Sequence, residues 1–278
     1  MKANFFGVFM ADTTNHLDRA ALSNAEFFSP AYLEKRRRAM EAHTAFKGVD
    51  ALDPKLPAGH AYAIRKSTWL TTNTKLDQRK ASMDIKPQEV IDVLNSAGVK
   101  NWALMGLHGY VGYMPSPRAT QDVDVMVPYG QRNRAKKAIA SRWPELIIRE
   151  LSQVIRFMDP LDLDREGQPK PAIDLMQPWS PFQELILKEY VIVDAETQHR
   201  IPTLEAALVS KYATLVSPHR DREKKEYDAG DFRRLARANY DQIKEADLRR
   251  LAGLIWEGGA DEAMRFVEIA LTDEPFPI

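Results

Sequence analysis

The segment most informative about the fold lies near the middle of the chain and reads Arg118-Ala119-Thr120-Gln121-Asp122-Val123-Asp124-Val125-Met126-Val127. Side chains alternate between polar and apolar from residue 121 onward, as they do in a half-buried strand. Asp122 and Asp124 therefore share one face of this strand, about 7 Å apart along it. The valines between and after them occupy the opposite face, which we expect to pack against a basic helix over residues 131–142.

A helix and a short strand are predicted just upstream of this stretch. Apolar residues recur at helical spacing over residues 87–97, and Gly98 supplies a suitable C-terminal stop. A strand over residues 102–105 should follow. It leads through Gly106 into a glycine-containing turn and helix.

Downstream, a further strand offers a third carboxylate. Strands are expected over residues 146–150 and 154–158, and then over 172–176, where apolar residues flank Asp174 on both sides. Asp174 should thus stand on a neighbouring strand beside the first two acids. A last strand is expected over residues 191–193.

The spacing of two aspartates alone is weak evidence, because the chain repeats it. Asp162-Leu163-Asp164 has the same D-x-D spacing, but proline and glycine flank it and we place it in a loop. What distinguishes Asp122 and Asp124 is the ordered context of an upstream glycine turn and a later strand-borne acid.

The remaining regions complete a three-part organisation: an N-terminal extension over residues 1–84, an α/β core over 85–201 and a helical domain over 202–278. A proline following an N-cap serine predicts a helix over residues 30–46, and the polar stretch 71–75 is typical of a linker or clamp. Helical periodicity marks the C-terminal region at residues 203–216, 227–238, 247–256 and 261–271.

Composition bounds the class of protein. In 278 residues, 39 basic side chains balance 39 acidic ones, so any binding of polyanions must be local. No apolar stretch approaches the roughly 20 residues needed to cross a bilayer. We read the apolar residues 5–11 as part of the folded protein rather than as a signal peptide, and the absence of cysteine is compatible with a cytoplasmic protein.

Several enzyme classes lack their signatures here. The sequence contains no H-E-x-x-H zinc site, no G-x-x-x-x-G-K-[ST] phosphate loop and no G-x-S-x-G nucleophile turn. Zinc hydrolases, P-loop NTPases and α/β-hydrolases are therefore disfavoured.

The order of glycine, helix, R-x-T-x-D-h-D-h and a later h-D-h, with h an apolar residue, resembles the nucleotidyltransferase superfamily that shares the polymerase beta catalytic fold. The likeness is greatest to its bacterial abortive-infection-toxin-like and minimal nucleotidyltransferases, and it covers residues 85–237. It implies an α+β protein with a small mixed β-sheet core and packed helices, to which this chain adds the N-terminal extension and the C-terminal helical lobe.

The resemblance also implies a role for each acid. Asp122 and Asp124 would bind Mg²⁺ or Mn²⁺, which prefer oxygen ligands. Asp174 would bind one metal ion and help to deprotonate the acceptor hydroxyl.

Five more residues are implied on the phosphate side. Gly106 would lie beside the phosphates, Arg118 and Thr120 would shape the triphosphate pocket, and Lys211 would contact a phosphate. Leu107 stands where the family usually has glycine or serine, and its bulk is expected to weaken binding of the triphosphate.

The function that the resemblance implies is transfer of a nucleoside monophosphate from a nucleoside triphosphate to a hydroxyl on RNA such as tRNA, on a protein or on a small molecule. A toxin–antitoxin role with an antitoxin-like partner is a further expectation. Two alternatives stay open: a catalytically degenerate protein of the same fold that regulates or binds a partner, and a glycosyltransferase whose D-x-D holds the metal.

Overall fold

The computed structural model describes residues 30–31, 59–77 and 82–278, and everything below refers to these. The apolar stretch 5–11 lies outside the described residues. So does the helix predicted over 30–46, except for residues 30–31, which are helical. The domain boundaries at residues 84 and 201 stay predictions.

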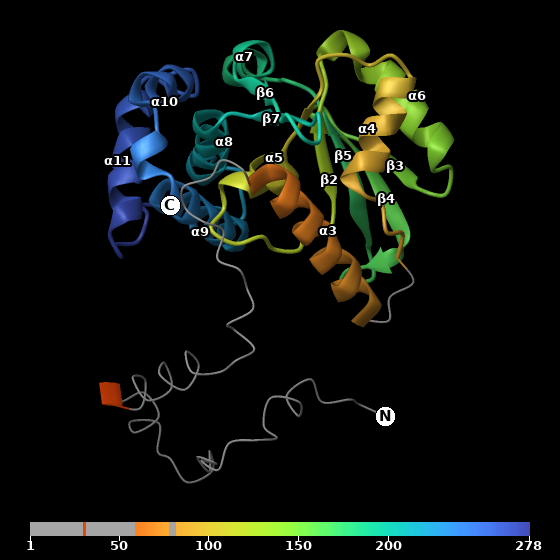
Figure 1. Cartoon of the computed structure of the whole chain (residues 1–278), viewed down its shortest axis with the longest axis horizontal. Helices are drawn as coiled ribbons and strands as arrows, with labels where there is room; N and C mark the ends of the chain where they lie inside the picture. The colour runs from red at the N-terminus through yellow and green to blue at the C-terminus, as the bar shows by residue number, and fades with distance from the viewer. Residues whose placement is uncertain (1–29, 32–58, 78–81) are drawn as a thin grey trace. The chain divides into compact units, whose positions relative to one another are not determined.

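A five-stranded mixed sheet forms the centre of the described chain (Figure 1). Its strand order is β1-β2-β5-β4-β3, in which only the β2–β5 pair is parallel. The strands span Ala103–Leu104 (β1), Val123–Met126 (β2), Ile147–Glu150 (β3), Val154–Leu163 (β4) and Pro169–Met176 (β5). The predicted α+β class with a small mixed sheet is confirmed.

Helices α4 (Pro87–Ser96) and α6 (Arg132–Arg142) lie along one face of this sheet (Figure 1). The apolar face of β2 is buried in the same core as Ile139 of α6, because Val123 and Val125 are at most 1% exposed. The predicted alternation of β2 is therefore confirmed, and the carboxylates are left on the opposite face. Gly98, with a φ of +68°, follows α4 as expected of a helix stop.

The predicted linker over residues 71–75 is wrong, because these residues belong to helix α3 (Gly59–Asp77). Thr71 and Thr74 donate their hydroxyls to the carbonyl oxygens of Ser67 and Leu70, four residues earlier. Such bonds let a threonine-rich stretch stay helical. Its weak apolar periodicity explains why the sequence did not reveal it.

The loop predicted around Asp162 is also wrong, because β4 continues to Leu163 and pairs there with β5. An irregularity in the register between Asp159 and Leu163 accommodates the intervening proline. The turn is confined to the residues after Leu163, where the Asp164 carboxylate accepts two backbone N–H bonds and Gly167 has a φ of +77°.

Two elements between the sheet and the C-terminal helices differ from expectation. The strand predicted over 191–193 exists as β6 (Val191–Val193), but it pairs with β7 (Arg200–Pro202) in a separate two-stranded sheet. Helix α7 (Pro181–Glu189) was not predicted, although proline at its first position after Ser180 is a recognised start signal.

The described elements after β7 are helical, as predicted: α8 (Leu204–Val216), α9 (Arg222–Ala238), α10 (Glu245–Ala252) and α11 (Gly259–Leu271). They lie together beyond one side of the sheet (Figure 1). Stacked and edge-on aromatic rings of Phe232, Phe266 and Phe276 fill their interior. No helix in the described ranges has the length and apolar character needed to cross a membrane.

Candidate metal centre

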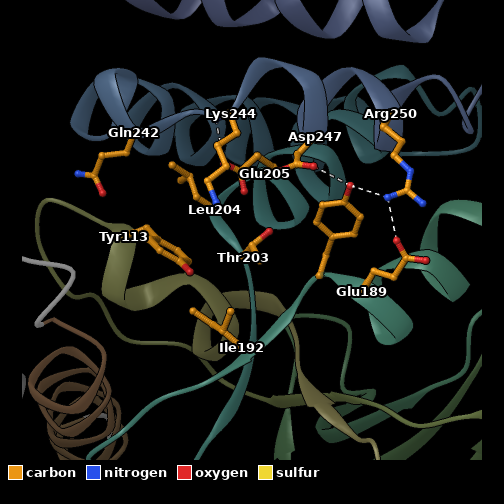
Figure 2. Close-up of a pocket in the computed structure, with 11 residues that line it drawn as sticks. Tyr113, Glu189, Ile192, Thr203, Leu204, Glu205, Gln242, Lys244, Asp247 and Arg250 are labelled. Carbon is orange, nitrogen blue, oxygen red and sulfur yellow. Dashed lines mark hydrogen bonds and ion pairs between the residues drawn. The ribbon is translucent and has the colours of Figure 1, made fainter.

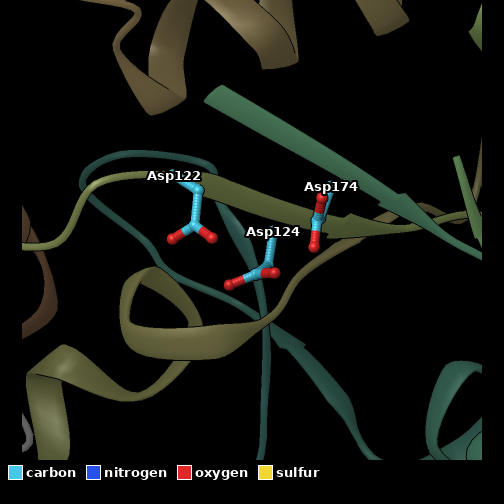
Figure 3. A group of neighbouring side chains, drawn as sticks. All are labelled: Asp122, Asp124 and Asp174. Atoms are coloured by element: carbon cyan, nitrogen blue, oxygen red, sulfur yellow. The ribbon is translucent and has the colours of Figure 1, made fainter. Parts of the chain in front are cut away.

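Asp122, Asp124 and Asp174 converge on one point, as the sequence predicted (Figure 3). One carboxylate oxygen from each lies within 4.8 Å of the others. Asp124 on β2 and Asp174 on β5 are direct partners in the parallel register, and Asp122 precedes β2 on the same face. The pairing of β2 with β5 therefore places all three side chains on the same face of the sheet.

Gly106 closes the cluster from the other side, at the end of β1. Its φ is +52°, and a Cβ at this position would lie 1.9 Å from Asp124 Oδ2. Any side chain would thus collide with the carboxylate, and only glycine allows the backbone to approach so closely. The amide of Met105 donates to the carbonyl oxygen of Asp124 at 2.9 Å, which holds the two segments together.

The pKa values of all three carboxyl groups are raised above their ordinary values. Burial, followed by the charges of Asp122 and Asp174, raises the pKa of Asp124 well above its ordinary value. Burial also raises the pKa of Asp122. Burial raises the pKa of Asp174 to about 6, against the opposing effect of the Arg156 charge. Carboxylates so close together are disfavoured as three anions unless a cation neutralises them.

The cluster fits a hard divalent cation by two further observations. Its donors are all carboxylate oxygens, which Mg²⁺ and Mn²⁺ prefer. Asp174 Oδ1 is buried, and no described residue forms a hydrogen bond with it. A buried acceptor without a donor is costly, and a bound cation would satisfy it.

The other predicted phosphate-side residues lie in three places. Thr120 lies at the cluster, where its hydroxyl donates to Asp122 Oδ1 at 3.3 Å. Leu107 is 4% exposed and belongs to the hydrophobic core. Arg118 and Lys211 meet in a second cluster.

This second cluster is built around Asp231 of α9. Arg118 and Lys211 form ion pairs with Asp231 at 2.8 Å and 3.1 Å, and the Tyr110 hydroxyl donates to it at 2.7 Å. Lys211 also pairs with Asp228 at 2.7 Å, and its side chain is only 14% exposed. These bonds fasten α5 (Gly106–Tyr110), α8 and α9 behind the carboxylates. The charge of Lys211 lowers the pKa of Asp124, although its effect is smaller than those of burial and the neighbouring acids.

Helix α3 also contributes to the site; the sequence indicated a linker or clamp at residues 71–75 but not the helix that carries it. Ser67 donates its hydroxyl to the carbonyl oxygen of Arg118 at 2.6 Å, and the Thr120 amide donates to the Thr71 hydroxyl at 3.1 Å. The segment that leads into Asp122 is therefore held by two side chains from α3. Arg156, 3.4 Å from Asp174 Oδ2, was missed too, because only the β4–β5 register brings it there.

A separate pocket of about 430 Å³ lies between α7, α8 and α10 (Figure 2). Arg250 pairs with Glu189 at 2.8 Å, and the Tyr190 hydroxyl bonds to both Arg250 and Asp247. Its lining includes none of the predicted site residues. Because several of its charged groups already pair with one another, the carboxylate cluster remains the stronger candidate for chemistry.

Comparisons with known proteins add little. No protein-family model matches the chain, and no curated protein matches it. A solved structure with some similarity is the crystal structure of an antigenic nucleotidyltransferase-like protein from Paracoccidioides brasiliensis. The two are 13% identical, the likeness covers 64% of this chain and 89% of the other, and the TM-score is 0.36. At that TM-score the likeness carries no conclusion about this chain.

Proposed function

We propose that this chain is a metal-dependent nucleotidyltransferase that moves a nucleoside monophosphate from a nucleoside triphosphate to a hydroxyl. The observation that carries the proposal is the convergence of three carboxylates within 4.8 Å, with a buried oxygen of Asp174 that receives no hydrogen bond from a described residue. Asp122, Asp124 and Asp174 would hold Mg²⁺ or Mn²⁺. The bound ion would neutralise the phosphate oxygens and hold the attacking and leaving oxygens in line.

The protein's own groups have separate tasks in this reaction. Gly106 lets the backbone after β1 lie against Asp124, where the phosphates would bind, and α3 holds the segment from Arg118 to Thr120 beside it. Asp174, besides holding an ion, would help to remove the proton of the acceptor hydroxyl. The oxygen of the acceptor hydroxyl forms a new bond to the α-phosphorus. The bond between the α-phosphorus and the oxygen that bridges it to the β-phosphorus breaks, and pyrophosphate leaves with the electron pair.

The acceptor and the biological setting are also proposals. RNA such as tRNA, a protein or a small molecule can supply the hydroxyl, and a toxin–antitoxin role with an antitoxin-like partner fits an enzyme of this kind. The catalytically degenerate alternative rested on Leu107 and on the N-terminal extension. Leu107 is buried in the hydrophobic core.

An incorporation assay tests the proposal. The protein is incubated with each α-labelled nucleoside triphosphate, Mg²⁺ and RNA, protein or small-molecule acceptors, and transfer of label is measured. We expect metal-dependent labelling that Asp124→Asn abolishes. Asp164→Asn is the matched control, since it alters the other D-x-D pair at the β4–β5 turn, and it should keep activity. Tight triphosphate binding without transfer to any acceptor would favour the degenerate alternative.

A further inference from the structure

Four charged side chains form a row across the sheet on the face that carries the metal site. Backbone pairing places Asp124 opposite Asp174, Asp174 opposite Arg156, and Arg156 opposite Arg149. Directly paired residues project from the same face of a sheet. The row therefore runs from two acids on β2 and β5 to two arginines on β4 and β3.

The ion pairs of the next residue along β3 show which face of the sheet Arg149 occupies. Glu150, the residue after Arg149, forms ion pairs with Lys136 and Arg132 of α6. Because successive side chains of a strand point to opposite faces, Arg149 points away from α6. Arg149 is exposed, and the Arg156 side chain is 44% exposed, so both are accessible to a ligand at the metal site.

This arrangement leaves positive charge uncompensated. Like charges directly opposite each other destabilise a strand pair. Arg156 has Asp174 as its partner at 3.4 Å, whereas Arg149 forms no ion pair with any residue in the described ranges. Arg149 therefore presents, next to Arg156, a guanidinium group that no carboxylate in the described ranges engages.

We propose that Arg149 and Arg156 bind phosphodiester groups of a nucleic acid acceptor and so direct its hydroxyl to Asp174. The inference rests on the proposed function and names its acceptor class. The planar guanidinium group of arginine suits phosphate recognition, because it donates two parallel hydrogen bonds.

The position of the arginines separates them from the triphosphate. Gly106 approaches the acids from the β1 side, where the triphosphate is expected, and the arginines lie on the opposite side, beyond β5. Neighbouring strands are about 4.8 Å apart, so Arg149 on β3 lies roughly 14 Å from the β2 acid in the row. Repeated phosphates along a nucleic acid strand span that distance from the metal site.

The test measures binding without metal or turnover. A fluorescein-labelled single-stranded RNA of about 12 nucleotides is titrated with the full chain in EDTA, and anisotropy is recorded at several salt concentrations. We expect the wild type to bind and the Arg149→Gln/Arg156→Gln double variant to bind about tenfold more weakly. Each lost phosphate contact lowers the slope of log affinity against log salt by about 0.7, so the double variant should lose about 1.4.

The matched control removes two charges from the other face of the sheet. Lys137→Gln/Arg142→Gln on α6 should keep the wild-type RNA affinity. A wild type that does not bind RNA, or a double variant that binds like the control, would overturn the inference. The same holds if the Arg149→Gln variant instead loses affinity for Mg²⁺ and a non-hydrolysable triphosphate, because the arginine would then belong to the triphosphate. Failure of the incorporation assay alone, with these binding results intact, would count against the proposed function only.

Discussion

Replacing Asp174 with asparagine should stabilise the metal-free protein, because burial in the folded protein disfavours the ionised form of this carboxyl group. Burial raises its pKa from 3.8 to about 6. The folded protein then binds the proton more tightly than the unfolded chain, so the free energy of unfolding falls as pH rises through this window. At about 1.4 kcal/mol per pKa unit, the ionised group costs about 3 kcal/mol at pH 8.

The Asp174→Asn variant removes this cost, so the expected gain depends on pH in a defined way. Urea unfolding in EDTA should show a gain of up to about 3 kcal/mol at pH 8 and well under about 1 kcal/mol at pH 4, where the wild-type carboxyl is protonated in the folded state. Exposed Glu166 in the β4–β5 turn supplies the control, and Glu166→Gln should change stability little at either pH.

A bound metal ion should make the wild type more stable than Asp174→Asn. Saturating Mg²⁺ stabilises whichever form binds it, so the wild type should gain stability in Mg²⁺ whereas Asp174→Asn should not. A variant that is less stable than the wild type in EDTA at pH 8 would contradict this prediction. It would mean that the Arg156 ion pair outweighs burial and repulsion at this position.

Three further predictions follow from the site. Gly106→Ala should unfold at a lower temperature in thermal melts and lose Mg²⁺ affinity in calorimetry, since its Cβ would lie 1.9 Å from Asp124 Oδ2; wild-type values would contradict the geometry. Thr71→Val should lower kcat of nucleotide incorporation by severalfold while keeping the fold by circular dichroism, because Thr120 loses its hydrogen bond to α3. An unchanged kcat would show that α3 does not position the site. Asp231→Asn should cost about 2 kcal/mol in urea unfolding, because it removes the carboxylate that pairs with half-buried Arg118 and one of the two carboxylates that pair with Lys211. A loss under about 1 kcal/mol would show that the cluster is not structural.

The carboxylate cluster could be predicted from the sequence because its geometry is largely local. Period-two alternation alone puts Asp122 and Asp124 on one face of a strand, with the valines on the other. The third acid required a neighbouring strand, and apolar residues on both sides of Asp174 indicated one. The structure confirms each of these steps.

What the sequence did not reveal depends on pairing between distant segments. Arg156 approaches Asp174 only through the register of β4 on β5, and a shift of one residue would place it on the other face. Asp231 meets Arg118 across more than a hundred residues of chain, by way of helix packing. Neither partnership leaves a periodic signal in one sequence.

Helix α3 was missed for a different reason, which is local. Its threonine hydroxyls satisfy carbonyl groups within the helix, whereas the same residues in isolation favour turns and loops. Packing of its first residues against the protein core decides the outcome, since Ala63 and Ile64 are buried. Tertiary context therefore overrode local preference at the element that holds the Arg118–Thr120 segment.

In the proposed function, Asp122, Asp124 and Asp174 jointly hold a divalent cation against a triphosphate. Crystals grown with Mn²⁺ and a non-hydrolysable nucleoside triphosphate test it most directly, because anomalous scattering identifies the ion. We expect an anomalous peak within ligand distance of all three carboxylates, with phosphate oxygens completing the coordination. Triphosphate bound elsewhere, or no peak between these residues at saturating Mn²⁺, would contradict it.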